Sequence, residues 1–147
     1  MSLNEEVELL RNIPMFANIE PSKLKLLAFT SERMAFKDGD MLFRQGEQGD
    51  SAYVIIAGEA DVIVDTPKGP LTVAKLKRND IVGEIAILCD VPRTATVRAA
   101  TKLEAMVIAK DLFFRLIMEF PQMAVEIMRE LARRLDATNR KLTAKNA

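Results

Sequence analysis

The spacing of hydrophobic positions divides the chain into three stretches. Near the start, Leu24, Leu27 and Ala28 fall on one helical face, and short helices are predicted over residues 5–11 and 22–29, the second entered through Pro21. Between residues 32 and 109, short apolar runs alternate with turn residues, which is typical of strands in a sandwich or roll. The predicted strands cover residues 33–36, 41–44, 52–57, 60–65, 71–76, 95–100 and 103–109.

After residue 109 the helical spacing returns. It predicts a helix over residues 111–120, a break at Pro121 and a long helix to about residue 142. In this last helix the apolar positions alternate spacings of four and three, which is a heptad seam. Such a seam can pair with a second copy of the chain or pack on the chain's own roll, and the same residues satisfy both. The seam consists of Ala124, Met128, Leu131, Leu135, Thr138 and Leu142.

Length and composition are those of one ordinary globular domain. The chain has 147 residues, of which 49% are hydrophobic, and this is enough for one sizeable core. We therefore expect a single α+β domain over residues 1–147, with a helical segment (1–31), a β region (32–109) and C-terminal helices (110–147). Lysine plus arginine (21) equals aspartate plus glutamate (21), which argues against broad attraction to nucleic acid or anionic membranes.

Cysteine and histidine usage removes several classes of function. The single cysteine excludes an internal disulfide and a cysteine zinc cluster, and the absence of histidine removes the commonest metal ligand and general base. Most hydrolytic chemistries thereby lose their usual residues, and no metal or cofactor is expected. The absence of enzyme activity is an expectation that goes with the function described below. Acidic residues at Glu5, Glu6 and Glu8, and the lack of a long apolar run, predict a cytoplasmic protein without a membrane span.

Candidate chemistry is concentrated in residues 82–97, where one carboxylate and one guanidinium flank a tight turn. Gly83 lacks a Cβ, so a ligand can approach its backbone closely. Arg93 follows the rigid Pro92, and its planar fork suits two phosphate oxygens. Glu84 would repel an anion, but it can accept a hydrogen bond from a ribose hydroxyl. One cation for a phosphate and one acceptor for a sugar describe a cyclic nucleotide monophosphate.

This segment resembles the phosphate-binding cassette of the cyclic nucleotide-binding domain family, which includes catabolite activators and kinase regulatory subunits. The matching residues are Gly83-Glu84-Ile85-Ala86-Ile87-Leu88 and Pro92-Arg93-Thr94-Ala95-Thr96-Val97. Equivalents of other family motifs are Pro14-Met15-Phe16, Asp38-Gly39-Asp40, Gln45-Gly46-Glu47 and Ile56-Ala57-Gly58-Glu59-Ala60. The resemblance implies an antiparallel, jelly-roll-like β-roll of about eight strands, with N-terminal helices and two C-terminal helices.

The resemblance also implies a set of ligand-binding residues. They are Val73, Val82, Gly83, Glu84, Ile85, Ala86, Arg93, Thr94 and Ala95, with Arg129, Arg133 or Arg134 as candidates to close over the purine. A hydroxyl at the Thr94 position favours cGMP in the kinase branch, whereas bacterial members with serine or threonine there often use cAMP, so cAMP is expected. Cys89 is assigned no role. The paired acids Asp38 with Asp40 and Glu47 with Asp50 are expected to form turns.

The function implied is a cyclic nucleotide sensor in which ligand capture draws the cassette inward and moves the last helix. Its expected partners are a second copy of the chain, bound through that helix, and an effector protein not identified by the sequence. Direct DNA binding is not expected, because no helix-turn-helix follows Leu142. Two alternatives stay open: a regulatory piece of a larger channel, kinase, transporter or transcription regulator, and an interaction module that binds no nucleotide.

Overall fold

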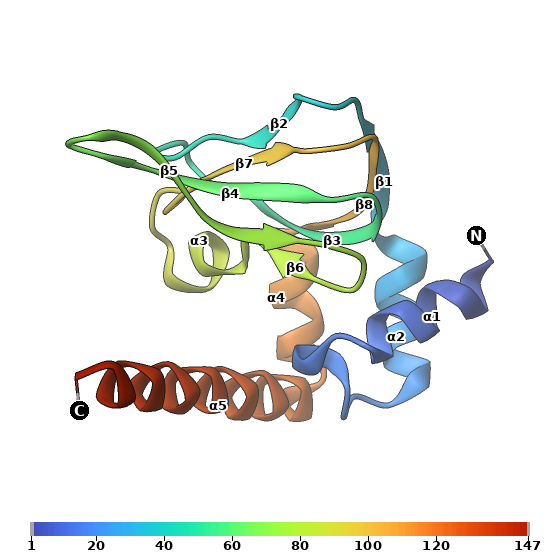
Figure 1. Cartoon of the computed structure of the whole chain (residues 1–147). Coiled ribbons are helices and arrows are strands. Elements are labelled where there is room, and N and C mark those ends of the chain that lie inside the picture. Colours follow the sequence, from blue (N-terminus) through green and yellow to red (C-terminus); the bar gives the residue numbers. More distant parts are fainter. Residues whose placement is uncertain (1, 147) are drawn as a thin grey trace. The chain divides into compact units, whose positions relative to one another are not determined.

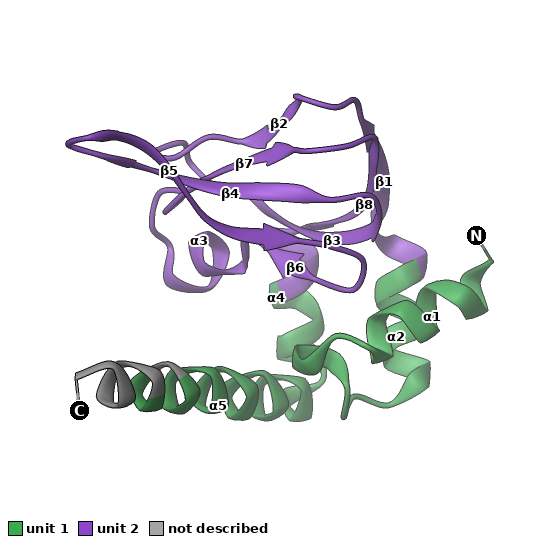
Figure 2. Cartoon of the chain, viewed as in Figure 1, with its two compact units in different colours: residues 1–28, 114–147 green, residues 29–113 purple. Residues whose placement is uncertain are grey.

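The computed structural model describes residues 2–146, apart from the side chains of residues 138 and 141–146. Contacts divide the chain into two compact units, one formed by residues 1–28 and 114–147 and the other by residues 29–113 (Figure 2). The divisions fall inside helices α2 (Pro21–Thr30) and α4 (Lys110–Glu119). The second unit is close to the predicted β region, and the extent of a single domain stays a prediction.

The unit of residues 29–113 contains two four-stranded sheets, with strand orders β1-β8-β3-β6 and β2-β7-β4-β5 (Figure 1). Every strand pairing is antiparallel. The strands are β1 (Glu32–Phe36), β2 (Met41–Phe43), β3 (Ser51–Ala57), β4 (Ala60–Thr66), β5 (Gly69–Leu76), β6 (Ile81–Val82), β7 (Thr96–Ala99) and β8 (Leu103–Ala109). The predicted β-roll is confirmed, and each predicted strand is present. The two-residue strand β6 and the short helix η1 described below were not predicted.

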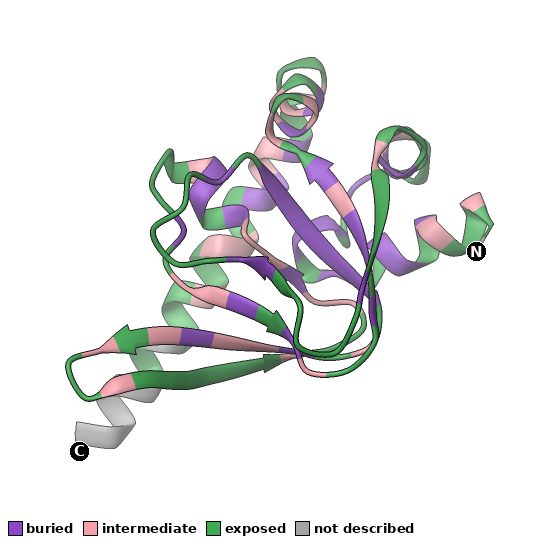
Figure 3. Ribbon diagram, turned by 90° about the horizontal axis from the view of Figure 1, so that it is seen from above, coloured by how far each residue is buried: buried purple, intermediate pink, exposed green. Residues whose placement is uncertain are grey.

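Burial explains why the strands differ in sequence pattern. Strand β3 is buried from Ser51 to Ile56, since its Tyr53 and Ile55 belong to the core described below and helix α3 (Glu84–Cys89) packs against the strand. A strand covered on both faces reads as a continuous apolar run. Strand β5 is an edge strand and is largely exposed, as Figure 3 shows for the projecting β4–β5 hairpin. Val73 on this strand is 52% exposed.

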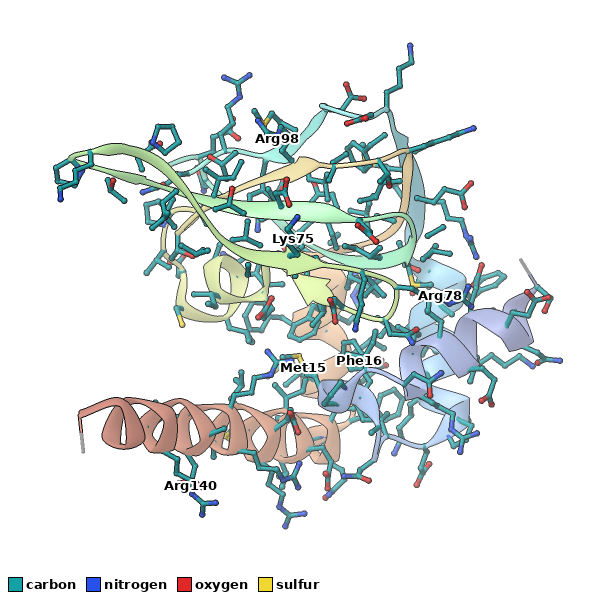
Figure 4. The ribbon with its side chains drawn as sticks, in the orientation of Figure 1. Met15, Phe16, Lys75, Arg78, Arg98 and Arg140 are labelled. Carbon is teal, nitrogen blue, oxygen red and sulfur yellow. The ribbon has the colours of Figure 1, made fainter. Side chains whose placement is uncertain are left out.

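Both sheets contribute apolar side chains to one core. Its buried residues are Phe36, Leu42, Phe43, Tyr53, Ile55, Ala60, Val97, Ala99, Leu103 and Ala105. Charged residues occupy other positions of the same strands: Asp61 on β4 lies 4.0 Å from Lys75 on β5 and 3.9 Å from Arg98 on β7 (Figure 4). Because side chains alternate between the two faces of a strand, β4 carries both Asp61 and the core residue Ala60, and β7 carries both Arg98 and the core residues Val97 and Ala99.

The unit of residues 1–28 and 114–147 is helical. It contains α1 (Leu3–Arg11), the short 3-10 helix η1 (Pro14–Phe16), most of α2, the end of α4, and α5 (Pro121–Asn146). Ser2 caps the start of α1, because its hydroxyl accepts a hydrogen bond from the Glu5 N–H. Helix η1 contacts both α1 and α5, and its Met15 and Phe16 are fully buried (Figure 4).

The two C-terminal helices agree with the prediction, and Pro121 is the first residue of α5. Proline suits this position because the first helical residue needs no N–H partner. Along the predicted seam, Met128 is 60% and Leu135 is 63% exposed, whereas Ala124 and Leu131 are half-buried. The seam positions Thr138 and Leu142 lie outside the described side chains.

Candidate functional site

A pocket of about 490 Å³, counting its open mouth, lies in the unit of residues 29–113. The structure brings together most of the predicted site residues around it: Val82, Gly83, Glu84, Ile85, Ala86, Arg93, Thr94 and Ala95. The predicted Val73 is not among the lining residues. Four residues that were not predicted complete the wall: Phe43, Val62, Ile81 and Val97. Strand register supplies these positions, since Val62 on β4 is paired with Val97 on β7.

Helix α3 is bracketed by two residues in the left-handed conformation. Gly83 precedes it with φ +89°, and Asp90 follows it with φ +53°. A Cβ on Gly83 would lie 2.5 Å from Nη1 of Arg93, so glycine meets both a conformational and a steric requirement here. The Arg93 side chain thus lies close to Gly83, and the approach of a ligand to this glycine stays a prediction.

Arg93 is buried in the pocket, with an exposed fraction of only 4%. Its Nη1 donates to the Gly83 carbonyl at 2.9 Å, and its Nη2 donates to the Ser51 carbonyl at 2.7 Å. Its Cζ lies 4.0 Å from the centroid of the Phe43 ring, which is cation–π geometry. The third nitrogen, Nε, is buried and has no hydrogen-bond partner among the described residues.

The electrostatics of this arginine favour an incoming anion. Burial lowers the pKa of the Arg93 guanidinium, and the nearby Tyr53, Asp50, Glu47 and Glu84 partly oppose that shift. The group stays ionised near neutral pH, because arginine titrates far above that range. Its two hydrogen bonds go to neutral backbone carbonyls, so a buried positive charge keeps donor capacity for a ligand.

Glu84 is the second charged residue of the pocket, and it is 8% exposed. It is the first residue of α3, directly after Gly83. The remaining lining residues are mostly apolar, with Thr94 as a hydroxyl next to Arg93. One buried cation, one buried carboxylate and an apolar wall suit a ligand that carries an anionic group, a polar hydroxyl and a flat apolar ring.

The three arginines predicted to close over a base lie on α5, in the other unit. Each is ion-paired along the helix: Arg129 with Glu126 at 3.1 Å, and Arg133 and Arg134 with Glu130 at 3.0 and 3.8 Å. Their role toward a base stays a prediction.

Two of the four acids expected in turns, Asp40 and Glu47, accept hydrogen bonds from nearby backbone. Asp40 Oδ2 accepts the Lys37 N–H at 2.8 Å, and Glu47 Oε1 accepts the Arg44 N–H at 2.6 Å. Cys89 is exposed at the end of α3. Within residues 2–146, the described side chains form no cluster of three or more histidine, cysteine or acidic groups that could hold a metal. Among the helices described, none is long and apolar enough to cross a membrane.

Comparison with known proteins agrees with this geometry. The chain is 37% identical over 109 residues to a cAMP-dependent protein kinase regulatory subunit from Blastocladiella emersonii, covering 74% of this chain and 27% of that protein. It is 30% identical over 136 residues to a CRP-like cAMP-activated global transcriptional regulator from Mycobacterium tuberculosis, covering 92% of this chain and 61% of the regulator. This chain thus spans about a quarter of the first relative and three fifths of the second.

Among solved structures, the N-terminal domain of a transcriptional regulator from Streptomyces coelicolor A3(2) superimposes with a TM-score of 0.79. The two chains are 28% identical, and the match covers 91% of this chain and 94% of that domain. The sequence profile of the cyclic nucleotide-binding domain matches residues 33–120, which is more than half of the chain and includes the whole pocket. The chain therefore belongs to the cyclic nucleotide-binding domain family.

Proposed function

We propose that the chain is a sensor that binds cAMP in preference to cGMP and acts as a regulatory module rather than an enzyme. The observation that carries the proposal is the buried Arg93 guanidinium, whose Nε has no partner, in the same pocket as the buried Glu84 carboxylate. Arg93 binds the cyclic phosphate, and Glu84 accepts a hydrogen bond from the ribose 2′-hydroxyl. The purine lies against the apolar wall that includes Val62 and Val82.

The preference for cAMP rests on the relatives, and Thr94 is compatible with it. Both relatives described above carry cAMP in their names. The Thr94 hydroxyl lines the pocket, where it helps to hold the phosphate and does not exclude an adenine. Replacing it tests this point: Thr94→Ala is expected to weaken cGMP binding more than cAMP binding in parallel titrations. Equal losses for the two nucleotides would remove Thr94 as a selectivity residue.

The decisive experiment for binding is calorimetric titration with cAMP and cGMP. In Arg93→Ala we expect cAMP affinity to fall roughly 100-fold or more. The variant loses the two charge-assisted hydrogen bonds that the guanidinium donates to the phosphate, each of which contributes about 1.5 kcal/mol or more. Arg93→Lys keeps the charge but loses the fork, so an intermediate affinity is expected. Arg78→Ala is the matched control, since Arg78 is an exposed arginine of the same unit.

Circular dichroism of each variant separates loss of binding from loss of fold. Wild-type protein that binds neither nucleotide, or an Arg93→Ala variant that is folded and binds as the wild type does, would contradict the proposal.

We further propose that α5 changes position when the nucleotide binds, in a cytoplasmic protein that passes the signal to an effector. Support comes from Pro121, which separates α4 from α5, and from the division of the chain within α4. Hydrogen exchange over residues 121–142 should change when saturating cAMP is added. Unchanged exchange there, with binding confirmed, would exclude this mechanism. The sequence of the source gene on both sides of these residues will show whether they are one part of a longer regulator.

A further inference from the structure

Lys110, the first residue of α4, is held at both its backbone and its side chain. Its N–H donates to the Asp50 carbonyl at 2.8 Å, and its ammonium group donates to Asp90 Oδ1 at 3.2 Å. The Lys110 side chain is 32% exposed, whereas the Asp90 side chain is 87% exposed. One residue therefore links the segment just before β3 to the residue that ends α3.

These two partners belong to the two segments that hold Arg93. Asp50 directly precedes Ser51, whose carbonyl accepts Nη2 of Arg93 at 2.7 Å. Asp90 ends the helix that begins just after Gly83, whose carbonyl accepts Nη1 at 2.9 Å. The guanidinium keeps both hydrogen bonds only while these segments keep their spacing. Any movement of α3 away from the start of β3 would stretch one of them.

The two ends of α3 are attached differently. Near its first residue, Val82 is paired with Tyr53 of β3, so the strand ladder fixes that end. Just after its last residue, the side-chain bridge from Lys110 to Asp90 supplies a link back to the segment before β3. This bridge spans twenty residues of sequence, so it is a tertiary contact and does not follow from helix geometry.

We propose that Lys110 is a positioning residue for the nucleotide site, which ties the C-terminal end of α3 to the start of β3 and so keeps Arg93 preorganised for the phosphate. The proposal rests on the function proposed above and adds to it a residue outside the pocket. Preorganisation raises affinity because the free protein has already restricted the groups that the ligand needs. Exposed ion pairs are weak, so we expect an effect of about two- to fivefold on affinity.

A competing explanation is that Asp90 is present only because its backbone is left-handed, a conformation that aspartate and asparagine tolerate better than most residues. Asp90→Asn separates the two roles, because asparagine keeps the tolerance and removes the charge. Lys110→Met keeps the aliphatic stem and removes the ammonium group, whereas Lys110→Arg keeps a cation. None of these variants removes the backbone hydrogen bond to Asp50.

The test is calorimetric titration of the full chain with cAMP at low and high salt. We expect Lys110→Met and Asp90→Asn each to weaken binding by about two- to fivefold at low salt, and the double variant to be no weaker than either single variant. Lys110→Arg should bind close to the wild type. The differences should shrink at roughly 1 M salt, where exposed charges are screened.

Melting temperatures without ligand, measured on the same variants, show whether each protein is folded. Single variants that bind as the wild type does, losses that add in the double variant, or losses that do not respond to salt would each overturn the role of Lys110 while leaving the proposed function intact. A wild-type protein that binds no cyclic nucleotide would overturn both.

Discussion

At the scale of single residues, the nucleotide site depends on how closely backbone can approach Arg93. Gly49 has an ordinary φ, yet a Cβ there would lie 2.6 Å from the Ala86 Cβ and 2.8 Å from Nε of Arg93. Ala86 is on α3, so Gly49 allows the cassette helix and the arginine to pack against the loop before β3. Its need for glycine is steric, and nothing in the local sequence pattern signals it.

We therefore predict that Gly49→Ala lowers both cAMP affinity and stability. Overpacking costs typically about 1–3 kcal/mol, because the backbone or the arginine must move. The expected result is a tenfold or greater loss of affinity, on the order of 1.4 kcal/mol, measured by titration, with a lower melting temperature. The control is the Gly49→Ala substitution made in the Arg93→Ala background. There it should lower stability less than it does in the wild type, because the clash with Arg93 is gone. A variant that binds and melts like the wild type would contradict this prediction, because it would show that the loop can move to admit the methyl group with no loss of free energy.

At the scale of elements, the sequence patterns predict what is local and miss what depends on register. The long strands and both C-terminal helices follow from alternation, helical spacing and Pro121. Strand β6 has two residues, too few for any periodicity to be seen. The pocket residues Val62 and Val97 come from strands that were predicted, but their common wall is formed only when β4 pairs with β7. Arg93 and Glu84 could be predicted from their charge and from the glycine and proline beside them. The Ser51 carbonyl that accepts a hydrogen bond from Arg93 could not, because a backbone group leaves no mark in the sequence.

Helix α5 carries the prediction of self-association. Met128 and Leu135 are exposed apolar side chains two helical turns apart on the predicted seam, and an exposed seam is stabilised when a second copy covers it. The double variant Met128→Lys, Leu135→Lys should be monomeric at concentrations where the wild type is dimeric in sedimentation equilibrium. Met118→Lys on α4 is the control, because Met118 is 80% exposed and lies outside the seam. A wild type that stays monomeric at all concentrations tested would leave α5 without this role.

At the scale of the whole molecule, the pocket lies entirely within residues 29–113, whereas α5 belongs to the other unit. A response of α5 to nucleotide therefore has to pass between the units, and α4 is a continuous helix across the division between residues 113 and 114. Phe113 and Leu116 are both buried on either side of that division. If a signal travels along the chain to α5, it depends on α4 staying stiff in this turn.

Arg115 is an exposed residue in the same turn of α4, where the stiffness of the helix can be changed. Arg115→Gly weakens the helix by about 1 kcal/mol, whereas Arg115→Ala favours it. We expect both variants to bind cAMP within about twofold of the wild type, because neither touches the pocket. Hydrogen exchange in α5 should then respond to saturating cAMP in the alanine variant and respond less in the glycine variant. Equal responses in the two variants would mean that the signal does not depend on the stiffness of α4, and the route between the units would have to be sought outside this helix.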